Sequence, residues 1–126
     1  MKIALAQLNC HIGNFESNTK NIIAAIGDAK QQGADLVVFP ELSVCGYPPR
    51  DFLEFSEFIG LCEEAAQQIA LTCTDIACII GLPTKNPNIK GKDLFNSAYF
   101  IEDGKVKAVV NKALLPNYDV FDEYRY

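Results

Sequence analysis

The chain has 126 residues, of which 49% are apolar and 21% are charged, and its formal net charge is −5. This length suits one domain, and the composition is that of a globular protein, not of a disordered one. The acidic balance argues against a nucleic-acid or anionic-membrane partner, because both require a basic surface, and no apolar run is long enough to span a bilayer.

The N-terminal part of the chain predicts a strand, a helix and a second strand. Residues 2–9 are apolar on both alternating faces, which is typical of a strand covered on both sides. Short polar side chains at 14–17 can cap a helix, and Gly33 stands where its C-terminus favours a positive φ. Residues 36–39 form a second buried run, so this βαβ order predicts two parallel strands. The apolar positions at helical spacing are Ile22, Ile23, Ile26 and Ala29.

A second amphipathic helix is predicted over residues 51–73, where apolar side chains recur three or four positions apart, with a break near Ser56. The apolar run 76–80 predicts a third strand. Residues 83–92 are rich in Pro, Asn, Gly and Lys and are expected to form a polar loop. This loop lacks the glycine spacing and the following helix of a phosphate-binding loop, so no nucleotide site is expected there.

Two further strands, 94–101 and 105–110, are joined by an Asp-Gly pair that favours a hairpin. After Lys112 the chain becomes irregular and aromatic. The predicted order is therefore strand, helix, strand, helix and three strands. This order indicates an α/β protein, or α+β with a mixed sheet, in a single unit without repeats or linkers.

The cysteines suggest thiols in a packed core. There are five, and no two form a C-x-x-C pair; the single histidine, His11, lies next to Cys10. This pattern is neither a disulfide framework nor a zinc site, so we expect no metal and a reducing, cytoplasmic location. Cys62, Cys73 and Cys78 are expected to be small core hydrophobes.

Glu41 and Lys112 each follow the end of a predicted strand. Functional sites of α/β sheets gather beyond the carboxyl ends of strands, and Pro40 stops the strand where Glu41 begins. If both ends lie on the same edge of the sheet, a carboxylate and an ammonium share one pocket. The structural alternative is that both are solvated surface charges or caps, which is the common fate of charged residues. Position alone leaves both interpretations open.

Two pairs of motifs resemble a known family. Residues 39–43 (FPELS) and 111–116 (NKALLP) resemble the nitrilase superfamily of carbon–nitrogen hydrolases. More closely, residues 46–53 (GYPPRDFL) and 115–126 (LPNYDVFDEYRY) resemble the glutaminase domain of glutamine-dependent NAD⁺ synthetases. The resemblance runs over the whole chain in unbroken order. One departure is Cys45, where relatives commonly carry threonine.

The resemblance implies an α-β-β-α sandwich with a Glu-Lys-Cys triad. Glu41 would be the general base that takes the thiol proton, and Lys112 would stabilise the oxyanion of the tetrahedral intermediate. The cysteine would form a thioester with the glutamyl group, since the thiolate is the competent nucleophile. Tyr118, Phe121 and Glu123 match positions that form the glutamine pocket or support the site.

The nucleophilic cysteine is expected to be absent from this chain. In the family it comes well after the position of Lys112, on a later strand. Cys45 lies only four positions from Glu41. However, the family's cysteine stands at a different strand end with its own oxyanion donors, and a nearby thiol is not by itself an activated one. Cys10 also follows a predicted strand and is no better placed.

Residues 1–126 are therefore expected to be the N-terminal half of a nitrilase-like glutamine amidohydrolase domain, truncated before its nucleophile and inactive alone. The resemblance implies a parent ligase that hydrolyses glutamine and supplies ammonia for the ATP-dependent amidation of deamido-NAD⁺. ATP and Mg²⁺ would act in its synthetase domain, and the fragment itself would need no cofactor. The partners would be glutamine, the C-terminal remainder and the synthetase domain. Two alternatives stay open: another nitrilase-superfamily amidase, and a non-catalytic half-domain that only assembles with a partner.

Half of a sandwich is expected to leave apolar strand faces and open edges uncovered, and such surfaces recruit partners or aggregate. We therefore expect the chain to associate with copies of itself or with the remainder of its parent. Residues that would normally pack in the core of this sandwich are Phe39, Ile79, Tyr99 and Val109.

Overall fold

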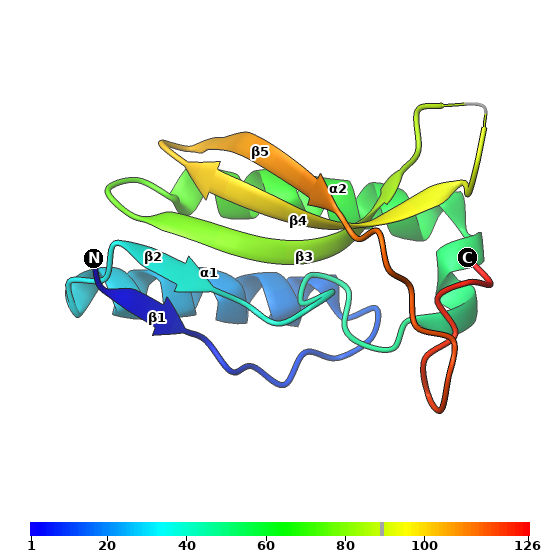
Figure 1. The fold of residues 1–126 in the computed structure, drawn as a ribbon. Coiled ribbons are helices and arrows are strands. Elements are labelled where there is room, and N and C mark those ends of the chain that lie inside the picture. Colours follow the sequence, from blue (N-terminus) through cyan, green and yellow to red (C-terminus); the bar gives the residue numbers. More distant parts are fainter. Residues whose placement is uncertain (89) are drawn as a thin grey trace.

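The computed structural model describes residues 1–88 and 90–126, which form one mixed sheet and two α-helices (Figure 1). The order of elements matches the predicted one, with a short 3-10 helix, η1, added before the second α-helix. The elements are β1 (Ile3–Leu5), α1 (Phe15–Gln31), β2 (Leu36–Val38), η1 (Arg50–Glu54), α2 (Ser56–Thr72), β3 (Ala77–Lys85), β4 (Leu94–Glu102) and β5 (Lys105–Asn111).

The five strands lie in the order β1-β2-β3-β4-β5. The first three are parallel and the last two are antiparallel to their neighbours, which confirms the mixed sheet. The predicted hairpin joins β4 to β5, and Asp103 and Gly104 both have positive φ values, 52° and 75°. This is the backbone of a type I′ turn, whose twist suits two adjacent strands.

The helix signals in the sequence are also confirmed. Asn14 caps α1 by accepting a hydrogen bond from the backbone N–H of Ser17, and Gly33 has a φ of 76° just after the helix. The predicted break near Ser56 falls where η1 ends and α2 begins. None of the helices in 1–88 and 90–126 combines the length and apolarity needed to cross a bilayer.

Both helices lie behind the sheet in Figure 1, on one face, and the core forms between them and that face. The strand register places one apolar row across all five strands on this helix side. Its three central members are buried and its two outer members are partly buried: Ala4, Val37, Cys78, Ile101 and Val106. Cys62, Cys73 and Cys78 are fully buried here, which confirms them as core residues.

The opposite face of the sheet has no helix on it. A second apolar row crosses the strands there: Leu5, Val38, Ile79, Phe100 and Ala108. Leu5 is 76% exposed, and Val110, on the same face, is 67% exposed. We call this surface the open face. Of the four residues expected to pack in a complete core, Phe39 is buried, Ile79 and Tyr99 are partly buried, and Val109 is 50% exposed.

Two details of the strand predictions were wrong. The first strand covers only Ile3–Leu5, and Ile3 is 52% exposed, so it is an edge strand and is not covered on both sides. The third strand continues to Lys85, through the proline at position 83 that suggested a loop. Because β2 pairs with β3 only over residues 77–79, Pro83 has a strand neighbour on one side alone, where proline is tolerated.

Candidate active site

Glu41 stands in a tight turn that is fixed to β3 on both sides. Before it, the backbone N–H of Phe39 donates to the carbonyl of Ile79 at 3.0 Å. After it, the N–H of Val44 donates to the carbonyl of Gly81 at 3.2 Å. The turn therefore continues the line of β2 and holds the carboxylate beyond the carboxyl end of β2, beside the middle of β3.

Gly81 permits this arrangement. A Cβ at this position would lie 2.6 Å from the backbone nitrogen of Leu42 and 3.3 Å from the Cα of Glu41. Leu42 itself has a φ of 49°, which is unusual for a residue with a side chain. The turn therefore passes so close to β3 at position 81 that only glycine, which has no Cβ, fits there.

Lys112 brings the C-terminal segment to the same place. It follows β5, and its backbone N–H donates to the carbonyl of Asn96 on β4 at 2.8 Å. Its Nζ lies 2.9 Å from Oε1 of Glu41 and 2.9 Å from Oε1 of Glu123. The structure thus brings together three of the five predicted site residues, as one ammonium between two carboxylates.

Asn96 is a fourth member that the sequence did not indicate. Its Nδ2 donates to Oε1 of Glu41 at 2.7 Å and to Oε2 of Glu123 at 3.3 Å. The sequence signal was a pair of polar residues, Asn96 and Ser97, within the otherwise apolar strand LFNSAYFI. We call Glu41, Asn96, Lys112 and Glu123 the charged cluster.

The charged cluster sets the protonation state of Lys112. Partial burial alone would lower its pKa, but hydrogen bonds to Glu123 and Glu41 outweigh that effect, and the pKa is raised. The side chain is therefore an ammonium at neutral pH. Burial raises the pKa of the nearby Tyr47 phenol, and the charges of Glu41 and Glu123 raise it further, so Tyr47 stays neutral.

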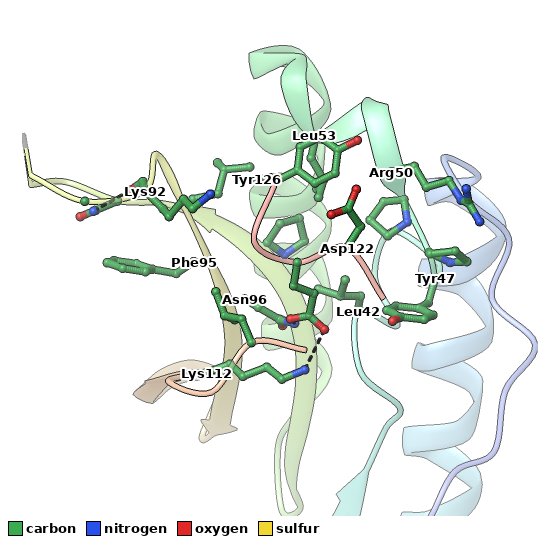
Figure 2. Close-up of a pocket in the computed structure, with 18 of the residues that line it drawn as sticks. Leu42, Tyr47, Arg50, Leu53, Lys92, Phe95, Asn96, Lys112, Asp122 and Tyr126 are labelled. Carbon is green, nitrogen blue, oxygen red and sulfur yellow. Dashed lines mark hydrogen bonds and ion pairs between the residues drawn. The ribbon is translucent and has the colours of Figure 1, made fainter. Parts of the chain in front are cut away.

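Two hollows flank the cluster. The larger, about 360 Å³, lies between β4, η1 and the C-terminal tail, and its walls include Tyr47, Leu53, Phe95 and Asp122. In Figure 2, Asn96 and Lys112 lie on its lower left side, Tyr47 lies to the right, and Leu53 and Tyr126 lie above. The smaller, about 240 Å³, opens on the open face. Glu41 lines only the smaller hollow, Glu123 only the larger, and Asn96 and Lys112 line both.

Tyr118 and Phe121 form an aromatic group with Tyr47. The rings of Tyr118 and Phe121 are 5.5 Å apart, edge to face, and Phe121 lies 6.2 Å from the ring of Tyr47. Neither belongs to the lining of the larger hollow, and Tyr118 is 67% exposed. Tyr47, which the motif GYPPRDFL contains but which was not singled out, lines the hollow instead.

The tail that carries Glu123 is tied to η1, so the two long motifs meet. Arg125 lies 3.1 Å from a carboxylate oxygen of Asp51 and 3.6 Å from one of Glu54. The hydroxyl of Tyr126 also donates to Asp51. These groups are exposed, and exposed ion pairs contribute little individually. Of these four residues, only Tyr126 lines the larger hollow.

No cysteine lines either hollow among the described residues. Cys45 is fully buried, and its thiol points to the backbone carbonyls of Leu42 and Gly46. Cys10 is half-buried, and burial raises the pKa of its thiol, as does the nearby Cys45. Within 1–88 and 90–126, no group of three or more His, Cys, Asp or Glu side chains could hold a metal ion.

Comparison with known proteins identifies similar chains. A family model described as carbon–nitrogen hydrolase matches residues 2–124. The glutamine-dependent NAD(+) synthetase of Synechocystis sp. is 44% identical over 128 residues, and the match covers 98% of this chain. The chain spans 23% of the length of that relative.

Solved structures agree with this match. A glutamine-dependent NAD⁺ synthetase from Acinetobacter baumannii, in complex with ADP, has a TM-score of 0.88 at 43% identity; the match covers 98% of this chain and 23% of that one. A mutant of the amidase from Nesterenkonia sp. AN1, whose active-site cysteine has undergone Michael addition of acrylamide, has a TM-score of 0.75 at 27% identity. That match covers 94% of this chain and 46% of the amidase.

Proposed function

The chain belongs to the carbon–nitrogen hydrolase family, and we propose that it forms the N-terminal half of a glutamine amidohydrolase domain in a glutamine-dependent NAD⁺ synthetase. The observation that carries this proposal is the position of Lys112 Nζ, 2.9 Å from both Glu41 and Glu123 beside a 360 Å³ hollow. Acyl transfer from an amide requires a general base and a positive charge near the oxyanion, and a carboxylate beside a fixed ammonium can supply both.

In the proposed reaction, Glu41 removes the proton from a cysteine thiol, and the sulfur attacks the carboxamide carbon of glutamine. Lys112 stabilises the oxyanion that forms, because its raised pKa keeps it charged. The carbon–nitrogen bond then breaks, ammonia leaves with the proton that Glu41 returns, and water hydrolyses the thioester to glutamate. Glu123 would help to hold the ammonium in place, since it accepts a hydrogen bond from Lys112 Nζ at 2.9 Å.

The two hollows suggest where the reactants lie. Glu41 lines the smaller hollow on the open face, so we propose that the thiol reaches it from that side, carried by a segment outside residues 1–126. Glutamine would occupy the larger hollow, next to Lys112 and Glu123. Tyr118 and Phe121 would support Tyr47 in its wall. The active-site cysteine of the similar amidase supports thiol chemistry for this fold.

The synthetase partner is assigned from the relatives. We propose that the released ammonia amidates deamido-NAD⁺ in an ATP- and Mg²⁺-dependent domain, as the ADP complex of the similar synthetase suggests. ATP and Mg²⁺ would act in this second step, and the glutamine hydrolysis proposed above uses neither. We assign both to another part of the protein. The five free thiols favour a reducing cytoplasm.

Residues 1–126 alone are expected to release no ammonia from glutamine, because no thiol of the described residues lines either hollow. A coupled ammonia assay on the purified fragment, compared with the full-length protein, tests this. The matched control is Cys45→Ala in both. Fragment activity that Cys45→Ala abolishes would contradict our exclusion of Cys45; activity that survives it would contradict the assignment of the nucleophile to another segment.

The open face leads to a prediction on assembly. Exposed apolar strand surface forgoes roughly 25 cal/mol per Å² of stabilisation, so we expect the isolated chain to associate with copies of itself or with the remainder of its parent. Sedimentation over a range of concentrations should give a rising molecular mass, with hydrogen exchange showing protection on the open-face strands. A concentration-independent monomer with protected strand amides would contradict this expectation.

A stand-alone amidase of the same family remains the second candidate, since the similar amidase matches 94% of this chain. The motifs GYPPRDFL and LPNYDVFDEYRY and the higher identity to the synthetases favour the first. The full-length protein distinguishes them: a synthetase makes NAD⁺ from deamido-NAD⁺, ATP and glutamine, whereas a stand-alone amidase produces ammonia without ATP.

A further inference from the structure

We propose that Asn96 is a positioning residue that holds the Glu41 carboxylate in the orientation needed for proton transfer. The inference rests on the proposed function, in which Glu41 is the base. Asn96 lies on β4, between the two hollows, and is half-buried. Its side-chain nitrogen joins Glu41, in the turn after β2, to Glu123, in the C-terminal tail.

The hydrogen-bond pattern fixes the orientation of this amide. An amide nitrogen has two N–H donors, and the two directions are used on Glu41 Oε1 at 2.7 Å and Glu123 Oε2 at 3.3 Å. Both partners are carboxylates, which accept hydrogen bonds when ionised. The opposite orientation of the amide would direct its oxygen at these acceptors. Asn96 is therefore held with its nitrogen toward the cluster.

The same pattern distinguishes the two oxygens of Glu41. Both Asn96 Nδ2 and Lys112 Nζ reach Oε1, at 2.7 and 2.9 Å. Among the described residues, no donor reaches Oε2, which leaves that oxygen available to accept a proton. The terminal torsion of a glutamate is soft, so a single donor would not stop the carboxylate from rotating. Two donors on one oxygen fix which oxygen faces the incoming thiol.

The backbone of Asn96 acts separately from its side chain. Its carbonyl accepts the N–H of Lys112 at 2.8 Å and thereby fixes the start of the C-terminal segment. A substitution of the side chain keeps this bond. Variants at position 96 therefore change the orientation of Glu41 while the position of the Lys112 backbone is preserved.

The test uses Asn96→Asp and Asn96→Ala in the full-length protein, each alone and combined with Glu41→Gln. Misplacing a catalytic group by about 1 Å can cost on the order of 10²-fold in rate. We expect each single variant to lower the glutamine-dependent kcat by about 10- to 100-fold, with little change in KM and with ammonia-driven synthesis unchanged. Since Asn96 acts through Glu41, adding its substitution to Glu41→Gln should cause no further loss, measured by residual rates at high enzyme concentration.

Three results would overturn the proposal. Equal losses with and without Glu41→Gln would show that Asn96 acts independently of the base. A raised KM at constant kcat would make it a substrate-binding residue. Loss of ammonia-driven synthesis in both Asn96→Ala and the isosteric Asn96→Asp would make its role structural. The proposed function fails separately, if Glu41→Gln itself leaves glutamine-dependent synthesis intact.

Discussion

Replacing Glu41 by Gln, or Lys112 by Ala, is expected to abolish glutamine-dependent synthesis in the full-length protein while synthesis from free ammonia continues. The amide of glutamine keeps the shape of Glu41 but cannot take a proton at neutral pH. A general base typically raises the rate of the chemical step by on the order of 10²- to 10⁴-fold. Removing the ammonium of Lys112 leaves the oxyanion without its stabilising charge, which should lower kcat by roughly 10²- to 10³-fold. The two nitrogen sources are compared by the rate of NAD⁺ formation at saturating substrate.

The matched controls are Glu64→Gln and Lys20→Ala, which change the same side chains at exposed positions on α2 and α1. Both should retain activity with either nitrogen source. Equal loss of glutamine- and ammonia-driven synthesis in the Glu41 and Lys112 variants would show that these residues serve folding or the synthetase site. That result would remove the proposed roles of both.

Gly81→Ala is expected to displace the turn that carries Glu41. The added Cβ would meet the backbone nitrogen of Leu42 at 2.6 Å, and backbone cannot move aside as a flexible side chain can. Overpacking of this kind costs about 1–3 kcal/mol, so the free energy of unfolding should fall by that amount. The glutamine-dependent rate should fall by about tenfold or more, because even a 1 Å displacement of a catalytic group is costly.

Gly60→Ala is the control for this prediction. Gly60 lies inside α2, and a Cβ there would have nothing within 4 Å. Alanine is the better helix former by up to about 1 kcal/mol, so Gly60→Ala should be neutral or stabilising. Urea unfolding at a fixed protein concentration measures both variants. If Gly81→Ala is as stable and active as Gly60→Ala, the close approach of the turn to β3 does not constrain the site.

Most of the fold could be predicted because its signals are local. The cap at Asn14, the positive φ at Gly33 and the hairpin turn at Asp103-Gly104 each depend on neighbours in sequence. The extension of β3 could not, since Pro83 is compatible with a strand only where β2 has ended, which is a property of the sheet. The exposure of Ile3 likewise depends on what lies beside β1.

The site was predictable in part for the same reason. Glu41 and Lys112 follow strands that the sequence revealed, and the family motifs include them. Asn96 appeared, with Ser97, as one of two polar residues in an otherwise apolar strand. Its alternation with Ala98 and Phe100 places it on the open face, but its contact with Glu41 arises only when β4 is set beside β3.

The charged cluster also has a consequence for the order of folding. Glu41 is 71 positions from Lys112 and 55 from Asn96, so its contacts close long loops. Closing such loops costs conformational entropy. Strand pairing offsets that cost, and only the pairing of β3, β4 and β5 in register brings the side chains of the cluster within reach of one another. We therefore expect the cluster to form only after β3, β4 and β5 have paired. Substitutions in the cluster should then change the rate of unfolding more than the rate of folding.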